Sequence, residues 1–307
     1  MSAVAQLPDG VTGATRREDA VRRLARNPTV LFGVVILALI VAMGICAPWL
    51  ANFDPAEINP GFRNKLPGAM ETVRLSDGSK SEVRHWMGTD SLGRDVASRV
   101  VYGARASLIV GISVALLAVS IGLVIGLAAG YLRASDGVVM RLMDGLMAIP
   151  AILLAIAVVS LSSAGLVAVI IAIVVPEVPR VVRLVRSIVL SVREEPYVEA
   201  AVAVGTPTLP LVIRHIMPNT LPPLIVQATY ICASAILIEA ILSYLGIGIP
   251  SQTPTWGNIM AEGRTLFRVY PHNILYPGIF LALTVLAVNL LGDGLRDTLD
   301  PRMRKRL

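Results

Sequence analysis

The 307-residue sequence has little charge, few aromatic residues and almost no cysteine. Charged residues make up 16% of the chain against 55% hydrophobic residues, a balance that excludes an ordinary soluble domain. The cysteines, Cys46 and Cys232, lie in apolar runs, which excludes a disulfide framework and a metal site with Cys/His spacing. The composition therefore predicts a membrane protein.

Catalytic motifs are also absent. The sequence has no glycine-rich loop with Lys-Ser or Lys-Thr that could bind phosphate, and no nucleophile motif. We therefore expect no catalytic residue, no metal, no cofactor bound by this chain and no ATP hydrolysis. The net charge of +6 does not indicate nucleic acid, because the arginines stand mostly beside apolar runs, where they determine membrane topology.

Long uncharged runs dominate the rest of the sequence, and about 20 apolar residues suffice to cross a bilayer as a helix. The run from 145 to 176 is too long for one crossing, so we expect a hairpin that turns near residues 160–165. The sequence thus predicts an all-α membrane protein with six transmembrane helices, at residues 30–50, 106–131, 140–161, 165–186, 222–246 and 273–293.

Arginine and lysine near the span ends fall on one side of these predicted helices, which marks that side as cytoplasmic. We expect both termini there, as tails of residues 1–29 and 294–307. A long loop, 51–105, would lie outside, and residues 106–293 would form a five-helix core. The first apolar run is too long for a cleaved signal peptide, and no small-residue cleavage site follows it.

A polar insert, residues 191–219, interrupts the apolar pattern. Pro196 suits the first turn of a helix, and Gly205 is a stop signal, so a short helix of about two to three turns is expected. Helical spacing gives it one apolar face of mostly small residues, which permits close approach of another surface. We expect this face to dock on a partner, and the alternative is a solvated loop helix. The face comprises Tyr197, Ala200, Ala201 and Val204.

Charges of alternating sign precede the second predicted span, with Gly93 among them. They can pair and hold an extracytoplasmic lip of the protein, either as a stabilising network or in contact with a partner. His85 just before them is expected to be a polar surface residue rather than a metal ligand, because no second ligand stands at suitable spacing. The charged residues of this predicted lip are Asp90, Arg94, Asp95 and Arg99.

Charges inside predicted spans usually face a bundle interior or water. Glu239 interrupts the fifth span and is our candidate for lining a translocation path; the alternatives are a hydrogen bond to a partner subunit or a structural pair. Glu177 and Arg180 stand at i, i+3 and can pair, and with Asp144 they are expected to fix helix packing. Glycines in the second span favour close helix contact, at positions Gly111, Gly122, Gly126 and Gly130.

Two segments resemble a known family. Glu199-Ala200-Ala201, followed by Gly205 and Pro218, resembles the Glu-Ala-Ala loop of binding-protein-dependent ABC importer permeases, with departures at His215 and Met217. Residues 85–105 are similar to the C-type subunit of dipeptide and oligopeptide ABC permeases. Further matches to that subunit lie at residues 242–248, 256–257 and 289–301.

The resemblance implies the type I ABC importer permease fold and a chain that translocates di- or oligopeptides. The implied partners are a homologous B-type permease, two ATPase subunits or domains that carry ATP and Mg, an extracytoplasmic solute-binding protein and the lipid membrane. It also implies a bacterial or archaeal plasma membrane. The ATPase would contact the insert, through Tyr197, Glu199, Ala200, Ala201, Val204, Gly205 and Pro218.

Other functions fit the sequence less well. An ion-coupled secondary transporter would need interrupted helices with midplane ion ligands in related halves, and no such pair of segments is evident. A membrane-embedded enzyme would need a catalytic constellation within the spans, and none is present. Relatives with this pattern also serve glutathione and nickel complexes, so the substrate depends on the binding protein, and peptide is the single expectation.

Overall fold

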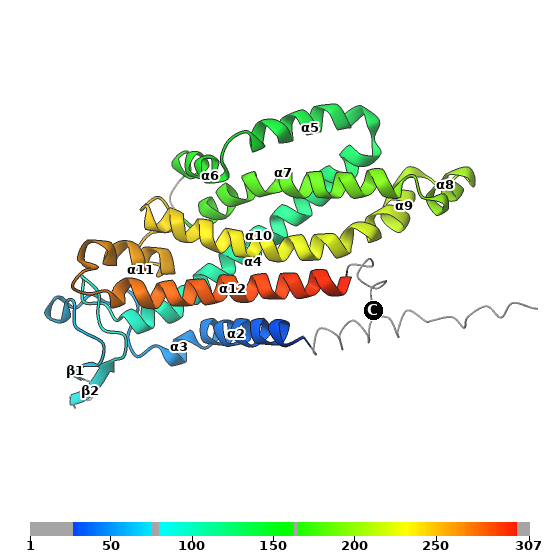
Figure 1. Ribbon diagram of the computed structural model, residues 1–307. Helices are drawn as coiled ribbons and strands as arrows, with labels where there is room; N and C mark the ends of the chain where they lie inside the picture. The colour runs from blue at the N-terminus through cyan, green and yellow to red at the C-terminus, as the bar shows by residue number, and fades with distance from the viewer. Residues whose placement is uncertain (1–26, 75–79, 163–164, 300–307) are drawn as a thin grey trace, which may run out of the picture.

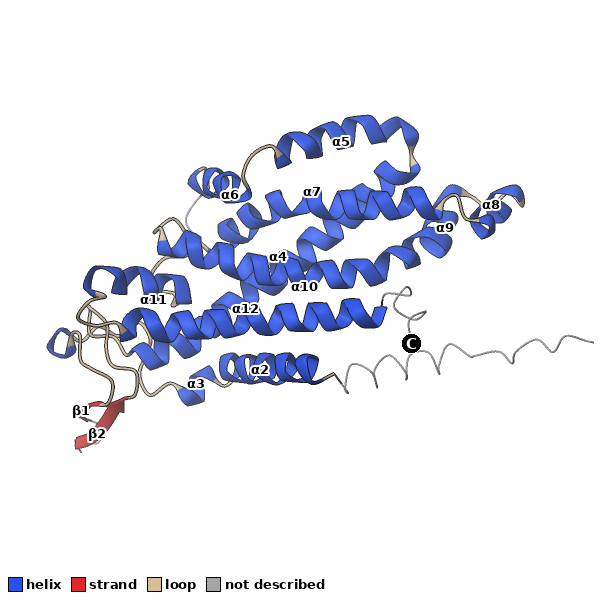
Figure 2. Ribbon diagram, in the orientation of Figure 1, coloured by secondary structure: helices blue, strands red, loops and turns tan. Residues whose placement is uncertain are grey.

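A computed structural model describes residues 27–74, 80–162 and 165–299. Within these residues the chain forms a bundle of long helices that run roughly side by side, with a small β-hairpin at one end (Figure 1). Figure 2 shows how far helix predominates over strand. Residues 1–26 and 300–307, most of the two expected tails, lie outside the described residues.

The long helices match the predicted apolar runs. In the described part of the chain, four helices are long and apolar enough to cross a membrane: Pro28–Ile45, Val96–Tyr131, Thr208–Tyr244 and His272–Thr298. They contain helices α2 (Pro28–Ile45), α4 (Val96–Tyr131), α10 (Met217–Tyr244) and α12 (His272–Leu299). Helix α7 (Leu166–Val192) is equally long but carries several charges, including Glu177 and Arg180.

The prediction of one continuous helix over residues 140–161 is wrong. The chain there forms α5 (Arg133–Met147) and α6 (Ala151–Ser160), which are bent by 89° relative to each other. Pro150 stands at the break, has no N–H to donate and restricts the backbone of the residue before it. The expected turn is confirmed, since α6 ends at Ser160 and α7 begins at Leu166; residues 163–164 within it lie outside the described residues.

Shorter elements connect the long helices. Strand β1 (Ala69–Arg74) pairs antiparallel with β2 (Lys80–His85), a hairpin that the sequence analysis missed. Helix α4 begins at Val96 and thus takes in the end of the predicted loop 51–105. The remaining short elements are α3 (Ala47–Leu50), η1 (Pro60–Phe62), α8 (Pro196–Ala203), α9 (Thr208–Leu211), the π-helical turn η2 (Val212–Ile216), α11 (Trp256–Gly263) and η3 (Arg264–Leu266).

The bundle has two distinct ends (Figure 1). Helix α8 lies at one of them, which we call the α8 end. The β-hairpin, α3 and α11 lie at the other, the hairpin end. Helix α2 begins and α12 finishes at the α8 end, so the described chain starts and stops on the same side of the bundle (Figure 1).

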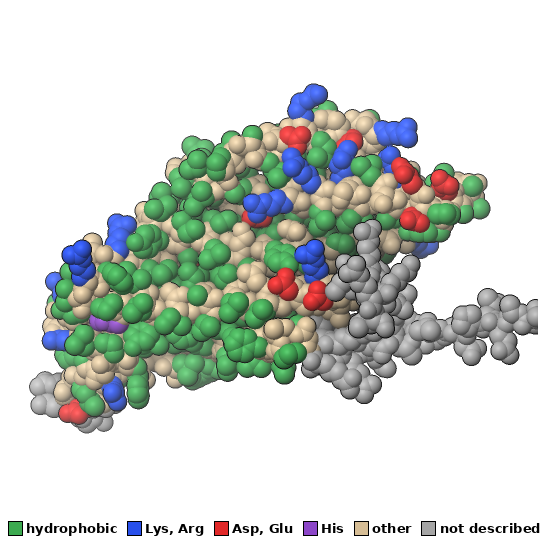
Figure 3. Space-filling view, viewed as in Figure 1, with side chains coloured by type: hydrophobic (Ala, Val, Ile, Leu, Met, Phe, Trp, Pro, Cys, Tyr) green, Lys and Arg blue, Asp and Glu red, His purple; other side chains and the backbone are tan. Residues whose placement is uncertain are grey.

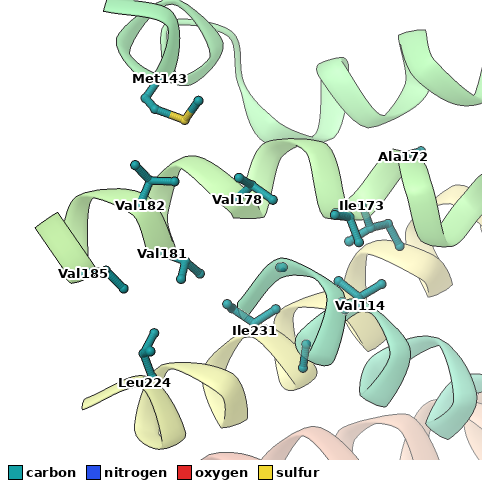
Figure 4. Close-up of a cluster of buried hydrophobic side chains, with 14 of the residues drawn as sticks. Val114, Met143, Ala172, Ile173, Val178, Val181, Val182, Val185, Leu224 and Ile231 are labelled. Atoms are coloured by element: carbon teal, nitrogen blue, oxygen red, sulfur yellow. The ribbon is translucent and has the colours of Figure 1, made fainter. Parts of the chain in front are cut away.

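Glycines let α4 approach its neighbours closely, as predicted from their spacing. A Cβ atom added at Gly122, Gly126 or Gly130 would lie 2.5–2.6 Å from the Cβ of a valine of α7. Those valines are Val181, Val185 and Val189, all fully buried. Figure 4 shows Val181 pointing toward Ile231 and Val185 toward Leu224 of α10, with Ile173 of α7 beside Val114 of α4. Nearer the middle of α4, Gly111 approaches the side chain of Ile236 of α10 in the same way.

Replacement of Gly126 by leucine should therefore push α4 away from α7. The added side chain has no space beside Val185, and overpacking of this kind costs about 1–3 kcal/mol. We expect a lower thermal unfolding midpoint of the detergent-solubilised protein. The control is Gly145→Ala in α5, where a Cβ would meet nothing within 4 Å, and this change should leave the midpoint unchanged or raise it. Equal midpoints for Gly126→Leu and the parent would show that the contact is not tight.

Candidate functional site

Helix α8 is a short helix closed by signals at both ends. Pro196 occupies the first turn after Glu195, and Glu199 lies in the same turn, where a negative charge suits the helix dipole. At the other end Gly205 has φ +82°, a left-handed conformation that favours glycine. The N–H groups of Gly205 and Thr206 donate to the carbonyls of Val202 and Ala201, a Schellman motif. The stop predicted at Gly205 is confirmed.

The surface of α8 differs from the single docking face that helical spacing predicts. Tyr197, Ala200 and Val204 are exposed, Val204 to 82%. Ala201 is buried and joins Val198 in the contact of α8 with the rest of the chain. The spacing placed Ala201 beside the other three because periodicity alone does not tell which side of a helix its own protein covers. Glu199 and Gly205 are exposed as well.

A hydrogen-bonded tie links α8 to the start of α10. Tyr197 Oη donates to the carbonyl oxygen of His215 at 3.4 Å, and Asn219 Nδ2 donates to Tyr197 Oη at 3.1 Å. Asn219 Nδ2 also donates to the His215 carbonyl at 2.7 Å. Pro218 lies exposed in the first turn of α10 between these residues. These hydrogen bonds connect α8 directly to the start of α10, and α7 precedes α8 in the chain.

The predicted lip residues come together at the hairpin end in a buried network of charges. Asp90 accepts from Arg94 Nε at 2.7 Å and from Arg99 Nη1 at 2.5 Å. Glu262 of α11 accepts from both arginines, and its bond to Arg99 Nη1 measures 2.5 Å. Arg99 has no exposed surface. Two arginines and two carboxylates balance in charge, so the network fastens α11 to the start of α4. Glu262 was not predicted from the sequence, because it is remote from the arginines in the chain and belongs to no motif.

His85 is not the surface residue expected from the sequence, because it is 1% exposed. Its Nδ1 lies 2.8 Å from Asp95 and its Nε2 lies 2.9 Å from Glu71, while Phe53 stacks on the ring at 4.5 Å. Both ring nitrogens of His85 thus lie within hydrogen-bonding distance of a carboxylate. Asp95 also accepts from the N–H of Ser98 and caps α4. His85 therefore joins both strands of the hairpin to the start of α4.

Gly93 permits the tight loop that gathers these charges. Its φ is +84°, and a side chain there would collide with the carbonyl oxygen of Asn59. Asp90 fixes the same loop, because its Oδ1 accepts from the N–H groups of Leu92 and Arg94 at 2.8 and 2.9 Å. The backbone thus holds the carboxylate of Asp90 facing the two arginines.

Glu239 has no exposed surface and lies inside the subunit, toward the hairpin end of α10. Ser243 donates to it at 2.8 Å from the next turn, and Ser107 of α4 donates at 3.4 Å. A hydroxyl network of this kind keeps a buried carboxyl group satisfied. The assignment of Glu239 to a translocation path stays a prediction.

Three arginines of α7 form ion pairs. Arg180 donates to Glu177 at 3.0 Å, which confirms the pair predicted from the i, i+3 spacing. Two further pairs fasten α5 to α7 near the α8 end: Arg183 with Asp144 at 2.5 Å, and Arg186 with Asp136 at 2.5 and 2.7 Å. Asp144 thus contributes to helix packing, as expected.

These features define a multi-pass membrane protein with a short, surface-exposed helix at one end of the bundle and a buried network of paired charges at the other. Residues 92–305 match the family model described as binding-protein-dependent transport system inner membrane component. Residues 15–67 match the model described as N-terminal TM domain of oligopeptide transport permease C. The first match covers more than half of the chain, and the chain belongs to this family of transport-system permease components, which are not themselves catalytic.

Relatives are similar over nearly their whole length. The probable peptide ABC transporter permease protein y4tQ of Sinorhizobium fredii is 50% identical, over 93% of each chain. The dipeptide transport system permease protein DppC of Alkalihalophilus pseudofirmus is 39% identical, over 96% of this chain and 93% of its own. A solved structure of the MetNI methionine ABC transporter, inward facing, aligns with a TM-score of 0.53 at 22% identity, over 65% of this chain and 95% of that chain. That likeness shows the fold.

Loss of Glu262 should loosen the hairpin end. Glu262→Gln leaves Arg94 and Arg99 with Asp90 as their shared carboxylate, and removal of one partner from a buried ionic network costs about 3–5 kcal/mol. We expect a clearly lower thermal unfolding midpoint in detergent. The control is Glu82→Gln at an exposed position of β2, which should change the free energy of unfolding by no more than about 0.5 kcal/mol. A midpoint for Glu262→Gln equal to that of the control would contradict the role of the network.

Proposed function

We propose that the protein is the C-type permease subunit of an ATP-driven importer of di- and oligopeptides, which an extracytoplasmic solute-binding protein delivers. The observation that carries this proposal is the α8 loop: Glu199 and Ala200 are exposed on α8, Ala201 faces the rest of the subunit and Gly205 follows the helix, on a chain of the permease family. Peptide is the substrate class that the names of y4tQ and DppC print.

The proposed topology has six membrane crossings in a type I importer fold, with both termini in the cytoplasm. The common side on which α2 begins and α12 ends supports it (Figure 1). Arginines near the α8 end, such as Arg133, Arg186 and Arg193, favour that end as the cytoplasmic one. The hairpin end would then face outward, with Asp90, Gly93, Arg94, Asp95 and Arg99 in the lip of the permease.

The proposed assembly has a homologous B-type permease and two ATPase subunits or domains in a bacterial or archaeal plasma membrane. ATP and Mg would be bound by the ATPases, with no cofactor on this chain. Exposed Tyr197, Ala200 and Val204 offer the ATPase an apolar surface on α8. Val198 and Ala201 keep the opposite side of α8 on the permease.

The proposed mechanism is alternating access. ATP binding closes the ATPases and moves α8, and the tie from Tyr197 to His215 and Asn219 carries the movement to α10. The path then opens outward and peptide passes from the binding protein into it. Hydrolysis resets the transporter. Charge-paired α5 and α7 would move as one body, because Arg183 and Arg186 of α7 are held by carboxylates of α5.

A bulky residue at Ala200 should weaken the ATPase contact without disturbing the permease. Ala200 is exposed, so the tryptophan of Ala200→Trp would contact solvent in the isolated subunit. In the docked complex it would overfill the contact with the ATPase, which costs about 1–3 kcal/mol of binding free energy. We expect reduced co-purification of the ATPases or ATP hydrolysis that no longer drives transport, with the sister permease still bound. Ala134→Trp on exposed α5 is the control and should behave as the parent. Parental ATPase binding and parental transport in Ala200→Trp would reject the docking role of α8.

Glu239→Gln tests the pathway assignment. The amide oxygen of glutamine can accept from one of Ser243 and Ser107, and its NH2 group can donate to the hydroxyl oxygen of the other, so assembly should persist. We expect a changed rate of peptide uptake or a changed preference among peptides in reconstituted vesicles. Ser243→Ala removes one hydroxyl donor without altering charge and separates packing effects from charge effects. If Glu239→Gln transports every tested peptide like the parent, Glu239 does not line the path.

A further inference from the structure

Arg180 is an exposed residue within a largely buried segment of α7. Arg180 has a side chain that is 46% exposed, whereas all the remaining residues from 172 to 182 are buried or half-buried. Helices α4, α6 and α10 pack on the remaining sides of α7. Figure 3 shows basic side chains over α7 within a largely hydrophobic face. The outer surface of α7 at this level is thus a guanidinium group.

A buried carboxylate holds this guanidinium in place. Arg180 Nη1 donates to the two oxygens of Glu177 at 3.0 and 3.2 Å, and Glu177 has no exposed surface. Ser234 of α10 donates to the same carboxylate at 3.2 Å, so the pair lies on the seam between α7 and α10. Nε and Nη2 of Arg180 donate to none of the described residues, and both remain able to bind an anionic group.

Contact of the Arg180 guanidinium with lipid hydrocarbon would be energetically unfavourable. Charged side chains in spanning helices face a bundle interior or a water-filled path. Pro176 and Pro179 lie on either side of Glu177 and leave the carbonyl oxygens of Ala172 and Val175 without their helical N–H partners. Polar backbone at membrane depth is tolerated where it is buried in protein or lines a cavity. In the proposed topology this face of α7 therefore borders the substrate path.

The rest of the seam is aliphatic. Leu237 and Ile241 follow Ser234 by three and seven residues, hence on the same face of α10, and both are exposed. A single fixed cation on an aliphatic wall suits a ligand with one constant anionic group and variable side chains. Every peptide with a free C-terminus has such a group, and guanidinium binds carboxylates in a bidentate fashion.

We propose that Arg180 binds the C-terminal carboxylate of the peptide as it passes through the permease. Glu177 positions the arginine and touches no substrate. This proposal rests on the proposed function, because it concerns the peptide that the importer carries. It assigns the permease itself a role in substrate selection, in addition to the binding protein.

The experiment uses the complete transporter in proteoliposomes and compares uptake of trialanine with uptake of its C-terminal amide, each saturating the binding protein. Because Arg180→Gln alone strands the buried charge of Glu177, the main variant is Glu177→Gln with Arg180→Gln, which leaves no charge in the seam. We expect trialanine uptake to fall about tenfold and amide uptake to stay within about twofold, as loss of a charge-assisted contact predicts. Arg180→Lys, which keeps the charge without the fork, should give an intermediate rate.

Arg141→Gln is the matched control, since this arginine is exposed on α5 and forms no ion pair with any residue that the structure describes; both peptides should be taken up at the parental rate. Equal losses for trialanine and its amide in the double variant, or parental uptake of both, would overturn the proposal. So would loss of the sister permease from the purified complex, which would assign the pair to the subunit interface. If the parent complex assembles but imports neither peptide, the proposed substrate class itself fails.

Discussion

The close approach of α4 and α7 is the contact on which the rest of the structure depends. Gly122, Gly126 and Gly130 leave room for valines of α7, and lipid offers no hydrophobic force that could replace such packing. Helix α4 also packs on α2, α10, α11 and α12, so it is the centre of the bundle. Asp95 caps its start at the hairpin end, and its partner α7 leads directly into α8. One rigid pair of helices thus spans the distance between the two ends.

The sequence predicts the long apolar helices well because the physical demand for them is local. A run of about 20 uncharged residues has few alternatives in a bilayer, and glycines at four-residue spacing already indicate helix contact. The bend at Pro150 was missed because the uncharged run continues through it. The early start of α4 at Val96 was missed because charged Arg99 and Arg105 look like loop residues until Asp90 and Glu262 are seen to neutralise Arg99.

The features of the candidate site that depend on local sequence were likewise predictable, and those that depend on tertiary contacts were not. The stop at Gly205 and the pair of Glu177 with Arg180 depend on neighbours within one helical turn, and both were predictable. The burial of Ala201 and of His85 depends on which elements fold against them. Periodicity gives the faces of a helix but not the side that its own chain covers, and the carboxylates beside His85 come from a hairpin that no motif announces.

The bond between Arg99 and Glu262 joins residues 163 positions apart in the chain. Synthesis runs from the N-terminus, so Arg94 and Arg99 leave the ribosome well before Glu262 does. During that interval Asp90 is the carboxylate available to both arginines. Until α11 has been made, the network of Asp90, Arg94 and Arg99 has one positive charge without a partner carboxylate, and Glu262 supplies that carboxylate. A chain that ends before α11 therefore leaves the Arg94 and Arg99 side chains with Asp90 as their shared carboxylate.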